Sequence, residues 1–226
     1  MKIIISPQAF KGTLNALEAA DAIASGVRQV FPNAELMLLP LADGGDSTLE
    51  ILLKKFPSIR HEQPYVWGEL TETKEAVIES AQICGLALLP ASQRNPLLTS
   101  SYPIGKVILR GLDKGLRRFF IGIGGTATND GGAGIAQALG VRFLDQFGNE
   151  LPRGGGALEN LKKIDFSKMD SRIKEAQFIA ACDVENPLLG PKGATRIYSP
   201  QKGATPQMVE KLEKSLAKFA QTVKNQ

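Results

Sequence analysis

Apolar and amphipathic segments alternate along the first 55 residues of the chain. Residues 3–5 are apolar and β-branched, which is typical of a strand buried on both faces. Residues 14–30 repeat apolar side chains at helical spacing and predict an amphipathic helix. A second apolar run at 35–39 predicts another strand, and residues 48–55 predict a second helix. This order of strand, helix, strand and helix predicts a parallel sheet covered by helices.

The rest of the chain continues the alternation after an irregular region at residues 57–75, which contains the single histidine and the single tryptophan. Glycine-rich and proline-rich loops separate the later elements. The pattern predicts strands at 76–79, 117–123 and 177–181, a helix that includes 104–112, and an amphipathic helix over 205–223. The fold class we predict is therefore α/β.

Helix starts carry recognisable capping residues. Asn15 and Thr13 are the candidate caps of the first helix, and Glu18 follows Asn15 at the spacing of a capping box. Pro206 lies in the predicted first turn of the last helix, where proline is tolerated.

Composition narrows the class of protein. With 226 residues and 43% hydrophobic residues, the chain suits one large or two small packed domains. The net charge of +4 comes from scattered lysines, so we expect no nucleic-acid partner. The sequence contains no signal peptide and no apolar run long enough to span a membrane, which predicts a cytoplasmic protein without membrane contact. Cys84 and Cys182 are far apart and are expected to be reduced core residues.

Residues 121–134, IGIGGTATNDGGAG, place six glycines between a predicted strand and a predicted helix. Glycine loses much backbone freedom on folding, so such a loop needs a reason. One interpretation is a tight turn that lets the strand and helix pack closely. The other is a phosphate cradle, because bare N–H groups at a helix start attract anions. The loop alone leaves both interpretations open.

Polar loops of the same kind follow three predicted strands. Asp43 and Asp46 follow the second strand, Asp130 lies in the glycine loop, and Asp183 follows the strand at 177–181. Ligands bind beyond the carboxyl ends of strands in open α/β sheets, so we expect these loops to share one cleft. Carboxylates there suit phosphoryl transfer, which needs groups that hold Mg²⁺ and position an attacking hydroxyl. Lysines in small-residue loops, Lys11 and Lys202, suit binding of a phosphate or carboxylate.

Other catalytic classes find little support in the sequence. There is no GxxxxGK[ST] segment of a P-loop protein and no G-x-S-x-G nucleophile elbow. His61 lies in the irregular region, which disfavours a Ser-His-Asp triad. The dinucleotide fingerprint is incomplete, since Ala127 stands where a third glycine belongs.

Six segments together resemble the type-1 glycerate kinase family, in the order in which that family carries them. The segments are FKG at 10–12, LADGG at 41–45, RNPLLT at 94–99, GIGGTATNDGGAG at 122–134, ACDVENPLLG at 181–190 and PQKGA at 200–204. The resemblance implies ATP- and Mg²⁺-dependent phosphorylation of a hydroxyl of D-glycerate. It also implies two α/β domains with the active site in the cleft between them, and it explains the glycine loop as a ligand-facing turn.

The resemblance also implies a domain division and roles for individual residues. We expect the first part of a flavodoxin-like domain at 1–84, a second α/β domain at 85–204 and a C-terminal helix at 205–226. Catalytic roles fall to Asp43, Asp183 and Lys11, and metal binding to Asp130 and Asp46. Substrate and phosphate binding fall to Gly44, Gly45, Asn95, Gly124, Gly125, Thr126, Thr128, Asn129, Asn186 and Lys202.

The sequence departs from the family pattern at several positions, including Pro103 in place of a glycine and Lys106 in place of an acid, and its region 57–75 is shorter. Gln8-Ala9 stands where the family has Asp-Ser, and the family continues for more than a hundred residues beyond the position of Gln226. We therefore expect the first parallel sheet to be incomplete, with self-association through an exposed edge near residues 3–5. Two alternatives to a kinase remain: a truncated or decayed relative without kinase activity, and a non-catalytic protein that binds small anions or nucleotides.

Overall fold

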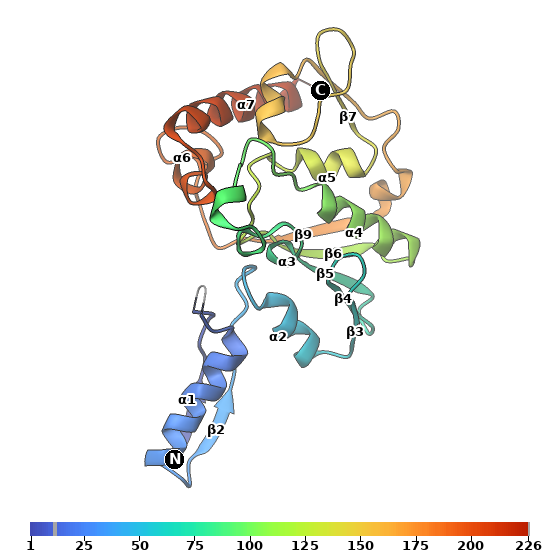
Figure 1. The fold of residues 1–226 in the computed structure, drawn as a ribbon. Coiled ribbons are helices and arrows are strands. Elements are labelled where there is room, and N and C mark those ends of the chain that lie inside the picture. Colours follow the sequence, from blue (N-terminus) through green and yellow to red (C-terminus); the bar gives the residue numbers. More distant parts are fainter. Residues whose placement is uncertain (11–12, 226) are drawn as a thin grey trace.

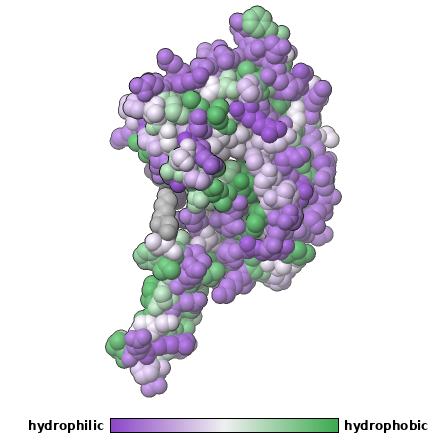
Figure 2. Space-filling model, in the orientation of Figure 1, coloured by the Kyte–Doolittle hydropathy of each residue, from purple (hydrophilic) through white to green (hydrophobic). Residues whose placement is uncertain are grey.

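The N-terminal unit consists of two parallel strands and one helix. The structure is a computed structural model that describes residues 1–10 and 13–225 (Figure 1). Strand β1 (Lys2–Ile5) pairs in parallel with β2 (Glu35–Leu38), which confirms the predicted direction. Helix α1 (Ala16–Val30) covers one face of the pair, where Ile5 is buried with alanines of the helix. Hydrophobic side chains are exposed along the rest of this projecting unit, including Ile4, Val30 and Met37 (Figure 2).

A five-stranded mixed sheet forms the centre of the molecule. Its order is β3 (Ser58–His61), β4 (Trp67–Leu70), β5 (Glu75–Glu79), β6 (Arg118–Gly122) and β9 (Gln177–Ala181). The pairs β5–β6 and β6–β9 are parallel, whereas β3–β4 and β4–β5 are antiparallel. Hydrogen bonds thus join strands from both sides of the predicted domain boundary at residues 84 and 85. The division into two domains remains a prediction.

The irregular region predicted at 57–75 is in fact an antiparallel hairpin, so that prediction is wrong. Prolines and charged residues interrupt the alternation that would identify its strands in the sequence. Side-chain contacts across the hairpin stabilise it instead. The rings of His61 and Trp67 stack with centroids 4.1 Å apart, and the His61 ring hydrogen-bonds Glu69 at 3.1 Å. The structure therefore gives this histidine a packing role.

Alternate side chains of the central strands pack on helices on opposite faces. Ile78 and Phe119 lie in the main core, with α4 (Tyr102–Asp113). Val77 lies on the other face, in a cluster with Leu49 of α2 (Thr48–Lys55). The short helix α3 (Ser80–Cys84) follows β5 directly. The sheet is therefore covered on both faces, as the predicted α/β class requires.

A second layer of structure lies above α4 in Figure 1, built around α5 (Ala133–Ala138) and α7 (Pro206–Lys224). Phe143 and Leu216 belong to its core. Its other regular elements are β7 (Arg142–Leu144), β8 (Lys163–Asp165) and α6 (Ala194–Tyr198). The 3-10 helices of the chain are η1 (Leu86–Leu88), η2 (Ala91–Gln93), η3 (Gly155–Asn160), η4 (Ser171–Glu175) and η5 (Pro200–Lys202).

Capping at the helix starts follows the sequence. Asn15 caps α1 through a capping box in which Glu18 N donates to Asn15 Oδ1 at 2.9 Å and Asn15 N donates to the Glu18 carboxylate at 2.9 Å.

The prediction for the cysteines is wrong in part, because Cys182 is exposed and Cys84 is half-buried. Across residues 1–10 and 13–225, no helix combines the length and apolar character needed to cross a membrane.

Candidate functional site

Two glycine-bearing loops meet at the carboxyl ends of β6 and β9. Gly124 N donates to Gly44 O at 3.1 Å, which joins the glycine loop directly to the Asp-Gly-Gly segment. A Cβ atom on Gly44 would lie 2.5 Å from Ala181 O, and one on Gly122 would lie 2.5 Å from Gly44 O. We call this contact between residues 43–46, 122–126 and 181 the loop junction. Its close backbone approach explains three of the glycines, as the tight-packing interpretation requires.

Asp43 lies beside the loop junction in a defined orientation. Gly45 N donates to Asp43 Oδ1 at 2.8 Å, and Gln8 Nε2 donates to Asp43 Oδ2 at 3.1 Å. The side chain of Asp46, in the same loop, is exposed. Gln8, which replaces the acid of the family pattern, therefore contributes a neutral hydrogen-bond donor where a second carboxylate would repel Asp43.

Glu79 is a buried acid at the site that sequence reasoning did not identify. It is the last residue of β5, is 2% exposed, and accepts a hydrogen bond from Leu49 N at 2.8 Å. Burial raises the pKa of Glu79, and its hydrogen bond from Leu49 opposes that rise. The carboxyl group satisfies a backbone donor at the start of α2, where Ser47 makes no side-chain cap. Glu79 thereby fastens the Asp43–Asp46 loop to the sheet.

Lys202 reaches the glycine loop from η5. Its Nζ donates to Thr128 O at 2.6 Å and lies 3.4 Å from Thr126 Oγ1. Burial lowers the pKa of Lys202 to about 8, although Cys84 and Asp130 act in the opposite direction. The neighbouring Cys84 thiol has its pKa raised to about 12, chiefly by burial and also by Asp130. Lys202 is thus a cation held close to the 126–128 backbone.

Asp130 is a hydrogen-bonding hub inside the molecule. Its Oδ2 accepts bonds from Ser101 N at 2.8 Å, Ser101 Oγ at 3.0 Å, Ser100 Oγ at 3.2 Å and Gly134 N at 3.2 Å. Its Oδ1 accepts a bond from Gly132 N at 3.1 Å. The side chain is 2% exposed and ties the starts of α4 and α5 together. Its oxygens are therefore committed to protein donors, and its predicted metal-binding role remains a prediction.

The predicted asparagines make contacts within the protein. Asn129 Nδ2 donates to Thr195 Oγ1 at 3.1 Å, at a buried position. Asn186 Oδ1 accepts a hydrogen bond from Tyr198 at 2.5 Å, which closes the loop after β9. Asn95 Oδ1 accepts from Leu97 N at 3.1 Å in a local turn. These contacts show how the loops are shaped; whether the asparagines also bind substrate remains a prediction.

The structure brings several predicted site residues to one edge of the central sheet. Gly44, Gly45, Gly124, Gly125 and Thr126 lie in the loop junction, and Asp43 and Asp46 belong to the same loop. Asp183 is exposed two residues beyond Ala181, which contacts Gly44. Asn95 and Asn186 shape neighbouring loops. Lys11 lies outside the described residues.

The carboxylates of this region have the right chemistry for Mg²⁺, which prefers oxygen ligands. Within residues 1–10 and 13–225, however, no three acidic, histidine or cysteine side chains gather closely enough to hold a metal ion. A Mg²⁺ that arrives with a nucleotide needs only one or two protein carboxylates. The exposed Asp46 and Asp183 suit that arrangement better than the fully bonded Asp130.

Comparison with known proteins now identifies the family. The sequence profile described as "Glycerate kinase family" matches residues 3–226. The chain belongs to the glycerate kinase family. It is 47% identical to the Bacillus subtilis (strain 168) glycerate kinase and 44% identical to the Escherichia coli (strain K12) glycerate 2-kinase. These alignments cover 97% and 99% of this chain, and 60% and 61% of the relatives.

A solved structure supports the same assignment. The crystal structure of a Salmonella typhimurium LT2 protein designated glycerate kinase 2 is 42% identical in sequence and superimposes with a TM-score of 0.82. The match covers 100% of this chain and 64% of that one. The chain thus has the fold of the corresponding part of a glycerate kinase and spans about three fifths of the length of its curated relatives.

Proposed function

We propose that the protein is a glycerate kinase that transfers the terminal phosphoryl group of ATP, supplied with Mg²⁺, to a hydroxyl of D-glycerate. The observation that carries the proposal is the loop junction. It places the Asp43 loop on the glycine loop, with Asp183 and Lys202 nearby. Phosphoryl transfer depends on positioning and on electrostatic stabilisation, and this arrangement offers both.

Asp43 is the residue we propose to accept the proton of the attacking hydroxyl. The glycerate oxygen forms a bond to the γ-phosphorus, the bond from that phosphorus to the β–γ bridging oxygen breaks, and ADP leaves with the electron pair. The released hydroxyl proton passes to Asp43, whose orientation is fixed by the bonds from Gly45 and Gln8.

Lys202 and the bare backbone of Gly124 and Gly125 are proposed to face the phosphates. A lysine ammonium is a point charge that suits phosphate oxygens, and glycine lets the backbone approach them closely. Mg²⁺ bound to the nucleotide neutralises charge that develops on the phosphates. Asp46 and Asp183 are the acids we propose to contact this ion.

The second candidate is a non-catalytic nucleotide or anion binder. One observation favours it: Gln8 donates a hydrogen bond to Asp43 Oδ2, which occupies an oxygen that a proton acceptor would use. The two functions differ in the release of ADP. A binder would take up ATP with the same affinity in the wild type and in D43N, but neither protein would release ADP when D-glycerate is added.

A coupled ADP-release assay with D-glycerate tests the proposed activity. We expect glycerate-dependent ADP production that falls by about 10²–10³ in D43N, the usual cost of one preorganised catalytic group. E72Q is the matched control, because Glu72 is an exposed acid outside the loop junction. Equal turnover by D43N and the wild type, or ADP release that does not depend on glycerate, would refute the role of Asp43.

Three further features belong to this proposal. The cellular site we propose is the cytoplasm, and the division we propose is into a flavodoxin-like unit and a second α/β domain.

Among the described residues β1 pairs only with β2, and Ile4 is 65% exposed. An open strand edge of this kind supports self-association. Light scattering across a range of protein concentrations tests it, since a constant monomer mass would contradict the idea.

A further inference from the structure

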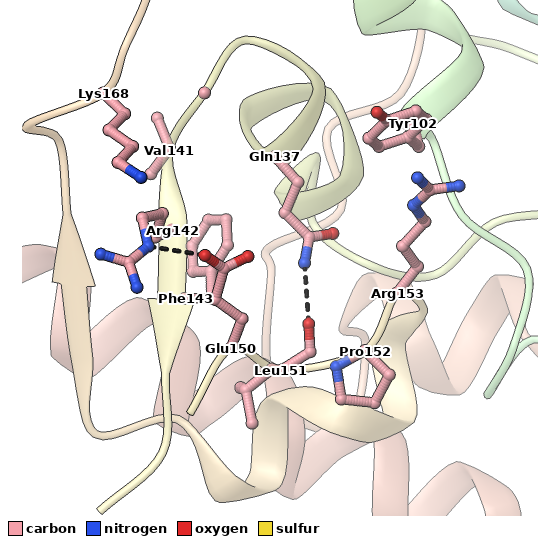
Figure 3. Close-up of a pocket in the computed structure, with 11 residues that line it drawn as sticks. Tyr102, Gln137, Val141, Arg142, Phe143, Glu150, Leu151, Pro152, Arg153 and Lys168 are labelled. Atoms are coloured by element: carbon pink, nitrogen blue, oxygen red, sulfur yellow. Dashed lines mark hydrogen bonds and ion pairs between the residues drawn. The ribbon is translucent and has the colours of Figure 1, made fainter. Parts of the chain in front are cut away.

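A hollow with a volume of about 500 Å³ lies beside α5, and no residue of the loop junction lines it. It opens between the start of α4, strand β7 and the segment 150–153, as Figure 3 shows. None of its lining residues belongs to the predicted catalytic or substrate-binding set. The side chains that matter to its chemistry are Tyr102, Gln137, Arg142, Glu150, Arg153 and Lys168.

The middle of the hollow contains one guanidinium that contacts two carboxylates. Arg142 Nε lies 2.6 Å from the Glu150 carboxylate, and its guanidinium also contacts Asp165 Oδ2 at 3.2 Å. Gln137 Nε2 donates to Leu151 O at 3.2 Å, so its amide orientation is fixed as well. These groups form a polar lining without a net positive charge.

The two sides of the hollow each carry a further cation. Arg153 and Lys168 lie on opposite sides of the opening in Figure 3, and both are exposed. Within residues 1–10 and 13–225, neither has a carboxylate within 4.0 Å. Arg153 and Lys168 are therefore two separate cations on opposite sides of the hollow, and the net charge of these two residues together with Arg142, Glu150 and Asp165 is +1.

Arg153 lies over the ring of Tyr102. The guanidinium carbon lies 3.4 Å from the centroid of the tyrosine ring, a cation–π contact. A guanidinium that stacks on a ring directs its N–H donors within its own plane, away from the ring. Those donors remain able to form a bidentate pair with a carboxylate or phosphate.

We propose that this hollow is a second ligand site, which binds a small organic anion with an acidic group at each end. One acidic group pairs with Arg153 and the other with Lys168, while the polar middle accommodates the connecting atoms. Dicarboxylates and phosphorylated carboxylic acids share this chemistry. An anion with one acidic group can engage only one of the two cations.

The site is physically connected to the proposed active site. Tyr102 follows Ser101, which donates twice to Asp130, and Arg153 precedes η3. A Cβ atom on Gly155 of η3 would lie 2.2 Å from Asn129 O, so this backbone is packed against the loop that contains Asp130. A ligand in the hollow thus contacts Tyr102 and Arg153, which lie close in sequence to residues that contact the glycine loop.

Isothermal titration calorimetry with succinate and butyrate tests the proposal, because both have four carbons and differ in the number of acidic groups. A third titration with 3-phosphoglycerate separates phosphorylated acids from dicarboxylates. All titrations contain Mg²⁺, a saturating non-hydrolysable ATP analogue and D-glycerate, so that the proposed active site is occupied without turnover. We expect succinate or 3-phosphoglycerate to bind at least tenfold more tightly than butyrate.

Variants assign the binding to the hollow. R153Q and K168Q are each expected to weaken the diacid at least tenfold, to the affinity of butyrate. The control R28Q/K162Q removes two exposed cations outside the hollow and is expected to change the affinity less than twofold. Equal affinities for succinate, 3-phosphoglycerate and butyrate, no measurable binding of any probe, or equal binding by K168Q and the wild type would each overturn the proposal.

Discussion

Replacing Asp130 with alanine tests whether this residue acts mainly as a structural hub. The change removes the acceptor of five hydrogen bonds, two of which come from the backbone N–H groups of Ser101 and Gly134 at buried positions. A buried donor left without a partner costs about 1–3 kcal/mol. We therefore expect D130A to lower the free energy of unfolding by about 2–6 kcal/mol. D130N retains one carbonyl oxygen and is expected to lose less.

Urea denaturation followed by the fluorescence of Trp67 measures the effect, because this single tryptophan is 1% exposed and lies in the main core. With a slope of about 1–3 kcal/mol per molar urea, the expected loss moves the midpoint by roughly 1 M or more. E72Q is the matched control, since Glu72 is an exposed acid outside the loop junction, and its effect is expected to stay within about 0.5 kcal/mol.

The outcome separates two roles for Asp130. If Asp130 is a structural hub, D130A is less stable than the wild type with or without Mg²⁺. A metal ligand would leave the metal-free stability unchanged and would lose the extra stability that Mg²⁺ with ATP provides through binding. An unchanged urea midpoint for D130A in the absence of metal would refute the structural reasoning.

Three further predictions follow from contacts around the loop junction. Burial lowers the pKa of Lys202 to about 8 from its usual 10.5, so the apparent affinity for MgATP should fall as the pH rises through 8. The folded state binds fewer protons than the unfolded state between these two values, so the free energy of unfolding should rise with pH there, by up to about 1.4 kcal/mol per unit. K202R stays charged and should lose both effects; identical pH profiles would contradict this assignment. E79A should lower the free energy of unfolding by about 1–3 kcal/mol, because Leu49 N loses its buried acceptor, and it should also raise the KM for glycerate. An equal effect of E72Q, at an exposed acid, would contradict the proposed role of Glu79 in holding the loop. G44A adds a Cβ that meets Ala181 O, so in chemical denaturation it should lose more stability than G115A, which has a similar positive φ and open space; equal losses would exclude the collision.

Local patterns in the sequence predicted most of the regular elements well. Residues 48–55 and 177–181 are the helix and strand that the structure contains, because apolar periodicity and flanking loops mark both. The capping box at Asn15 was also predictable, since it depends on residues three positions apart. The hairpin at 58–70 was not, because stacking of His61 on Trp67 stabilises it and such contacts leave no periodic signal.

The candidate site was predictable only in part. Polar loops after strands indicated that Asp43 and the glycine loop lie together, because parallel strands end at one edge of a sheet. Glu79 escaped notice because it ends strand β5 directly after the apolar residues 76–78, and its role depends on Leu49, 30 residues away. The contact between Lys202 and Thr128 spans 74 residues, and a pattern within one segment carries no information about it.

The loop junction also limits how the chain can change. Gly44, Gly122 and Gly124 meet through main-chain atoms, and a Cβ at any of them would come within 2.9 Å of another backbone atom. Main-chain atoms have no alternative rotamers, and a glycine partner has no side chain that a second substitution could make smaller. A substitution at one position therefore has no remedy in a smaller neighbour, unlike an oversized side chain in an ordinary core. In the language of genetics, these positions admit no local suppressor, and repair requires reversion.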